Sequence, residues 1–110
     1  MEKGAKLVVM ACNSASSVAA NPVTERFDLP LFEVITPAVD LSLTVSKNYR
    51  ICIIGTRATV NSCIYDKKIK GQHAAAQVFS VACPLLVPMV EEGWLKKPET
   101  RMIVKKYRLL

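Results

Sequence analysis

Short runs of apolar and β-branched residues alternate along this chain with segments typical of helices. The expected strands cover residues 6–11, 31–35, 50–54 and 77–82. A helical segment follows each of them, and this alternation favours a parallel sheet with flanking helices. The first run is apolar at every position after Lys6, as expected for a strand buried on both faces. The sequence therefore predicts an α/β fold.

Proline, glycine and capping residues indicate where the helices begin and end. Asn13 and Ser14 offer an N-cap for a first helix, which Pro22 is expected to interrupt before it resumes as far as Phe27. Gly71 is expected to end a single helix over residues 58–70. Other helices are expected over residues 36–47 and 84–93, and from Pro98 onward.

Composition excludes several classes of protein. The chain has 110 residues, of which 51% are hydrophobic, so it is not a disordered polymer. No apolar run approaches the ~20 residues that span a bilayer, and the start does not resemble a signal peptide, so we expect no membrane association. The four cysteines lack a C-x-x-C spacing, which argues against a metal site and favours free thiols in the cytoplasm.

Basic residues give the chain a net charge of +6 and concentrate in its second half. Such a cluster is either a nucleic-acid surface or a set of solvated helix faces. Aromatic residues make up only 6% and do not alternate with the lysines, so no platform for base stacking is visible. We therefore expect no nucleic-acid partner. The cluster comprises Lys67, Lys68, Lys70, Lys96, Lys97, Arg101, Lys105, Lys106 and Arg108.

Cys12 is the strongest candidate for a chemical role, because it lies where the first strand ends and a helix begins. Helix N-terminal amides lower the pKa of a thiol from ~8.5 and can bind a carboxylate. A thiol that ionises near neutral pH can exchange protons. Residues 55–57 and 82–84 follow strands in the same way, and ligands of such sheets bind beyond the carboxyl ends of the strands. The alternative is an inert, buried cysteine.

The remaining cysteines are interpreted as structural. Cys83 is followed by three apolar residues, an environment that raises the pKa of a thiol. Cys52 lies inside an expected strand and Cys63 inside an expected helix, so both are predicted to lie in the core. His73 follows the expected helix end and is predicted to be exposed to solvent.

Three segments resemble glutamate racemases. Ala11-Cys-Asn-Ser-Ala-Ser16 resembles the family's Ala-Cys-Asn-Thr-Ala-Ser motif, and Gly55-Thr-Arg-Ala-Thr59 is similar to its Gly-Thr-x-x-Thr segment. Residues 82–94 resemble its Ala-Cys-Pro-x-x-Val-Pro-x-x-Glu-x-Gly segment. The three occur in the family's order and extend over nearly the whole chain.

The resemblance implies a racemase that uses no cofactor and interconverts L- and D-glutamate with two thiols on opposite faces of the α-carbon. It implies that Cys12 is one catalytic thiol and that Asn13 and Ser14 hold the glutamate. Thr56 and Thr59 are expected to line the cleft. The implied product is D-glutamate for peptidoglycan, made in the cytoplasm.

The chain also departs from that family. It contains neither the Asp-Ser-Gly motif nor the Gly-Cys-Thr-His-Tyr-Pro motif that carries the second thiol. We therefore expect an internal portion of a two-lobe racemase, with residues 1–35 in the first lobe and 36–110 in most of the second. Such a portion is expected to be inactive alone, and to be marginally stable or to self-associate through exposed sheet edges.

Two other functions stay open at this point. One is a different cysteine enzyme, either an aspartate racemase or an enzyme in which Cys12 is a nucleophile and His73 its base. The other is a non-catalytic α/β module that binds an acidic partner through its basic face.

Overall fold

The computed structural model describes residues 4–108, which contain two separate parallel pairs of strands. In the first pair, β1 (Val8–Met10) aligns with β2 (Leu31–Glu33), and in the second, β3 (Arg50–Gly55) aligns with β4 (Gln77–Ala82). Helices connect the strands of each pair, as the parallel direction requires. The predicted α/β class with parallel pairing is confirmed.

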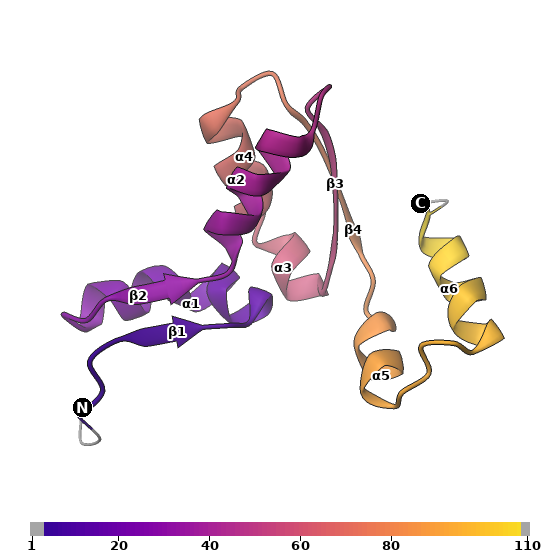
Figure 1. Cartoon of the computed structure of the whole chain (residues 1–110), viewed down its shortest axis with the longest axis horizontal. Coiled ribbons are helices and arrows are strands. Elements are labelled where there is room, and N and C mark those ends of the chain that lie inside the picture. Colours follow the sequence, from indigo (N-terminus) through magenta and orange to yellow (C-terminus); the bar gives the residue numbers. More distant parts are fainter. Residues whose placement is uncertain (1–3, 109–110) are drawn as a thin grey trace.

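The helices flank these strand pairs. Helix α1 (Asn13–Arg26) connects β1 to β2, and α2 (Ile35–Val45) leads on to β3. Helices α3 (Arg57–Asn61) and α4 (Ile64–Gln72) connect β3 to β4, and α5 (Leu86–Glu91) and α6 (Pro98–Arg108) follow. Figure 1 shows β1, β2 and α1 at one end of the long axis, with α5 and α6 at the other.

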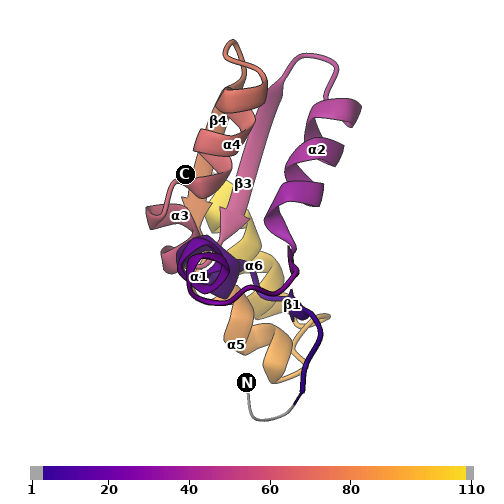
Figure 2. The same ribbon diagram turned by 90° about the vertical axis from the view of Figure 1, so that its left-hand side faces the viewer.

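The molecule is extended for its size. Its radius of gyration is 16.3 Å, whereas a compact domain of about 100 residues has a radius of about 13 Å. Figure 2 shows α2 and α4 beside β3, with α5 beyond the end of the sheet. Among the described residues, no helix has the length and apolar character to cross a bilayer.

The main core lies where α2 and α4 pack against the β3–β4 pair. Its buried members, all less than a tenth exposed, are Ile35, Val39, Ile51, Ile69 and Ala76. Successive strand residues point to opposite faces, so β3 and β4 place Ile51 and Val78 toward this core and leave Cys52 and Phe79 exposed. One face of this sheet is therefore covered and the other is open.

The prediction that the first strand is buried on both faces is wrong. Val9 is 63% exposed, and Phe32 beside it on β2 is 60% exposed. Helix α1 contacts β1 and β2, and their sheet has only two strands in the described part of the chain. The apolar run therefore has a helix on one side and solvent on the other.

The expected single helix over residues 58–70 is in fact two helices. The Ser62 hydroxyl donates to the Thr59 carbonyl (2.7 Å) and accepts from the Ile64 N–H (3.3 Å), which competes with helical hydrogen bonding. Cys63 then adopts a left-handed conformation, with φ of 55°. Cys63 is therefore exposed at the start of α4 and does not lie in the core as predicted.

Two other helices also differ from the predicted boundaries. Helix α1 continues through Pro22, which is exposed, so the expected interruption is absent. Helix α4 includes Gly71 and ends at Gln72, with His73 as its C-cap. His73 is half-buried and stacks on Tyr49 with ring centroids 3.8 Å apart, so its predicted exposure is wrong.

Glu33 starts helix α2 with its side chain. The carboxylate accepts hydrogen bonds from the N–H groups of Ile35 and Thr36 and from the Thr36 hydroxyl. Burial acts to raise the pKa of Glu33, but these hydrogen bonds and the nearby Lys68 ammonium together hold it below the usual value. The helix therefore begins with a charged capping group.

Candidate active site

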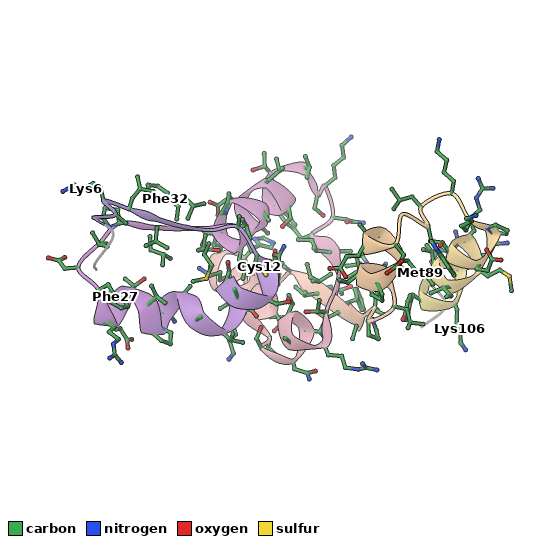
Figure 3. All side chains as sticks on the ribbon, turned by 90° about the horizontal axis from the view of Figure 1, so that it is seen from below. Lys6, Cys12, Phe27, Phe32, Met89 and Lys106 are labelled. Atoms are coloured by element: carbon green, nitrogen blue, oxygen red, sulfur yellow. The ribbon has the colours of Figure 1, made fainter. Side chains whose placement is uncertain are left out.

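Cys12 occupies the turn between β1 and α1. It is the N-cap of α1, with an extended backbone (φ −136°, ψ 120°), and its carbonyl accepts the Ser16 N–H at 2.8 Å. The Ser16 hydroxyl donates to the Met10 carbonyl at 3.1 Å, which ties the helix back to the strand. Cys12 is exposed, and Figure 3 shows it at the end of α1 opposite to Phe27. The expected strand-to-helix position of Cys12 is therefore observed.

A hydroxyl cluster joins this turn to the turn after β3. The Ser14 hydroxyl lies 2.7 Å from that of Thr56 and 3.5 Å from that of Thr59. Thr56 caps α3 by accepting the Thr59 N–H, and the two threonine hydroxyls lie 3.2 Å apart. Thr59 is only 4% exposed. The carboxyl ends of β1 and β3 thus meet through side chains that are about 40 residues apart in sequence.

Both turns open into one cavity of about 580 Å³, a typical size for a small-molecule site. Its lining includes all five residues singled out from the sequence, namely Cys12, Asn13, Ser14, Thr56 and Thr59. Of the described residues that line it, none is a lysine, arginine, aspartate or glutamate. An anionic ligand there would be held by hydroxyl and amide groups alone.

The cavity also contains side chains that the sequence interpretation missed. Tyr65, on α4, donates a hydrogen bond from its hydroxyl to Asn13 Oδ1. Ser42, on α2, and Cys52, on β3, also line the cavity. A single tyrosine or serine on a helix has no motif around it, so no local signal could have placed these residues at the site.

Cys52 is exposed, so its predicted burial in the core is wrong. The strand β3 that carries it has a helix-covered face and an open face, and Cys52 alternates with the core residue Ile51. A run of five strand residues that are mostly apolar does not reveal which face is open.

Cys83 lies at the cavity wall but is 2% exposed. Its thiol donates to the Val81 carbonyl at 3.6 Å, and its N–H donates to the Gly55 carbonyl at 2.8 Å. Burial, with a smaller contribution from Cys52, raises the pKa of the Cys83 thiol. These surroundings suit a structural thiol, in line with the sequence interpretation.

The four thiols should differ in their reaction with iodoacetamide. In the folded chain at pH 7.5, we expect Cys83 to react at least tenfold more slowly than Cys12, Cys52 and Cys63, because it is buried and protonated. Mass spectrometry of the digested protein measures each rate. In urea the four rates should converge, and equal rates in the folded protein would contradict the burial of Cys83.

The described part of the chain shows no cluster of metal-ligating side chains. Residues 4–108 contain no group of three histidine, cysteine, aspartate or glutamate side chains placed to hold a metal ion. The reactive and polar side chains that line the cavity are the thiols of Cys12, Cys52 and Cys83, the hydroxyls of Ser14, Ser42, Thr56, Thr59 and Tyr65, and the Asn13 carboxamide.

The structure combines parallel α/β units with a cysteine at a strand-to-helix turn and hydroxyl groups across a cavity. This combination is consistent with the family that the sequence comparison identifies. The model of the Asp/Glu/Hydantoin racemase family matches residues 1–105. The chain therefore belongs to the Asp/Glu/Hydantoin racemase family.

Within that family, the relatives and solved structures similar to this chain include several glutamate racemases. The chain is 43% identical over 106 residues to the glutamate racemase of Aquifex aeolicus, covering 96% of this chain and 41% of that protein. A glutamate racemase structure from Bacillus anthracis aligns with a TM-score of 0.89 at 31% identity, covering 94% of this chain and 39% of that one. The glutamate racemase of Francisella tularensis, solved in complex with D-glutamate, aligns with a TM-score of 0.88 at 31% identity, covering 96% and 40%.

The three comparisons give nearly the same coverage of the longer proteins. The chain spans about 40% of the length of the relatives that it matches. The predicted similarity to glutamate racemases is confirmed over nearly all of the chain.

Proposed function

We propose that this chain provides one catalytic thiol and part of the substrate site of a glutamate racemase. The observation that supports it most directly is the cavity in which the exposed Cys12 lies with Asn13 and the Ser14–Thr56–Thr59 hydroxyl cluster. Family membership and the similarity to glutamate racemases support the choice of substrate class.

In the proposed reaction, the Cys12 thiolate removes the α-proton of one glutamate enantiomer. The S–H bond forms as the C–H bond breaks, and the electron pair stays on the α-carbon. A second thiol on the opposite face then gives its proton to that carbon, which inverts the centre. Two groups are needed, because one thiol can only return the proton to the face from which it came. No other atom is gained or lost, so the step needs no oxidant or co-reactant.

Substrate binding is assigned to neutral donors. Helix α1 begins directly after Cys12, so its first N–H groups can bind an anion such as a carboxylate. Asn13 and Ser14 add side-chain donors at the same turn, while Thr56 and Thr59 line the facing wall. Because no charged side chain lines the cavity in the described residues, hydrogen bonding and the helix dipole provide the attraction.

The second thiol is proposed to come from a Gly-Cys-Thr-His-Tyr-Pro segment, which this sequence does not contain. We assign residues 1–35 to the first lobe of a racemase and 36–110 to most of the second. The biological role proposed is supply of D-glutamate for peptidoglycan in the cytoplasm.

Exposed apolar side chains on both strand pairs, such as Val9 and Ile54, favour self-association of the isolated chain.

A chimeric enzyme tests the proposal. The 106 matched residues of this chain would replace their counterparts in the Aquifex aeolicus glutamate racemase. We expect the chimera to racemise D- and L-glutamate, measured by circular dichroism, and to leave aspartate unchanged. The 110-residue chain alone should show no racemisation, because it lacks the Gly-Cys-Thr-His-Tyr-Pro segment proposed to carry the thiol on the opposite face. A folded chimera without turnover of glutamate would contradict the proposal, and turnover of aspartate would reassign the substrate.

A further inference from the structure

Tyr65 connects helix α4 to the first turn of α1. Its hydroxyl donates to Asn13 Oδ1, a residue 52 positions away in sequence. The Tyr65 side chain packs against the buried core cluster, beside Ile64 of the same helix. The core therefore fixes the ring, and the ring carries its hydroxyl to the cavity wall at Asn13.

The hydrogen bond determines which end of the Asn13 carboxamide is available to a ligand. An asparagine side chain has one acceptor oxygen and one NH₂ group with two donors. Because Oδ1 accepts from Tyr65, the NH₂ group is left to face other partners in the cavity. An NH₂ group can donate to a carboxylate, whereas an amide oxygen in the same place would repel it.

The Tyr65 hydroxyl stays a donor at neutral pH. Burial raises the pKa of Tyr65, and the nearby Glu33 carboxylate raises it further. Lys68, on the same helix as Tyr65, lies near the Glu33 carboxylate, and its ammonium group donates to the Thr36 hydroxyl at 2.9 Å. Glu33 and Lys68 both bond to Thr36, so neither takes the place of Tyr65 as the partner of Asn13.

We propose that Tyr65 is a positioning residue, which holds the Asn13 carboxamide so that its NH₂ group meets a carboxylate of the substrate. This inference rests on the proposed function, since that function supplies the dicarboxylic substrate. Without the hydroxyl, nothing from Tyr65 stops the carboxamide from turning over and presenting its oxygen to the ligand. Loss of one net hydrogen bond, about 0.5–1.5 kcal/mol, corresponds to a loss of affinity of about two- to twelvefold.

The test compares Tyr65→Phe with Tyr49→Phe in the ¹⁵N-labelled chain. Tyr49 is a matched control, because it stacks on His73 and does not line the cavity. Phenylalanine keeps the ring of Tyr65 in the core, and thermal unfolding verifies that each variant folds. We expect the Asn13 side-chain NH₂ resonances to move in Tyr65→Phe alone. The dissociation constant for D-glutamate, followed by the same spectra, should rise several-fold in Tyr65→Phe and stay unchanged in Tyr49→Phe.

A double variant separates positioning from a general structural role. If Tyr65 acts through Asn13, Tyr65→Phe should weaken D-glutamate binding in the wild-type background but not in Asn13→Ala. Equal losses in both backgrounds overturn the inference, and so do unmoved Asn13 resonances in a folded Tyr65→Phe. A wild-type chain that does not respond to D-glutamate also overturns it. These results are independent of the chimera, whose lack of racemisation would instead contradict the proposed function.

Discussion

Replacement of Cys12 by serine is expected to lower the racemisation rate of the chimeric enzyme by about 10³-fold or more. Serine keeps the size and the hydrogen-bonding capacity of the side chain at this exposed N-cap position. A serine hydroxyl forms an anion far less readily than a thiol does, and the proposed removal of the α-proton needs the anionic form. The effect should lie in kcat, because the cavity donors that bind the substrate are retained.

Cys63→Ser is the matched control for this experiment. Cys63 is also exposed and also an N-cap, but it does not line the cavity. We expect this variant to keep the activity of the unmodified chimera within about twofold, since surface changes rarely alter such a site. Retention of more than a tenth of the activity by Cys12→Ser would show that another group removes the proton.

Replacement of Ile69 by alanine is expected to be the most destabilising single core substitution. Ile69 is 0% exposed and lies in α4, where it packs in the cluster with Ile35 and Val39. Removing three buried carbons loses their transfer free energy and leaves a cavity, at a cost of about 2–5 kcal/mol. Whole domains have stabilities of only about 5–15 kcal/mol. The variant should therefore unfold at much lower urea concentration, as followed by circular dichroism.

Ile54→Ala provides the comparison at an exposed position. Ile54 is 65% exposed on β3, so the same substitution removes little buried area. We expect it to change the free energy of unfolding by less than about 1 kcal/mol. Similar midpoints for the two variants would mean that the α2–α4–β3 core does not stabilise the chain in solution.

Local sequence signals were enough to predict the elements and the turn that carries Cys12. The alternation of strands and helices depends on residues next to one another in sequence, and so does the position of Cys12 between β1 and α1. The predicted N-cap at Asn13 or Ser14 is wrong, because Cys12 is the N-cap and Asn13 is the first helical residue. The motif that places Thr56 and Thr59 after β3 is equally local. Their contact with Ser14 joins two separate strand pairs and depends on the tertiary structure.

Predictions that depended on burial were less reliable. Cys52 and Cys63 are predicted to lie in the core because they fall inside an expected strand and an expected helix, yet both are exposed. The first strand is predicted to be buried on both faces, yet Val9 faces solvent. Hydrophobicity shows that a residue can be buried, but whether a neighbour covers it depends on how the other elements are arranged.

The sequence alone determined the α/β class, the parallel direction of the strands and the position of Cys12 at a strand-to-helix turn, because each follows from short-range pattern. Only the tertiary structure decided that Tyr65 meets Asn13 and that the helix after Thr59 breaks at Cys63. The first is a contact between residues 52 positions apart, and the second depends on competing hydrogen bonds of Ser62. Contacts of this kind arise from packing, which no local pattern specifies.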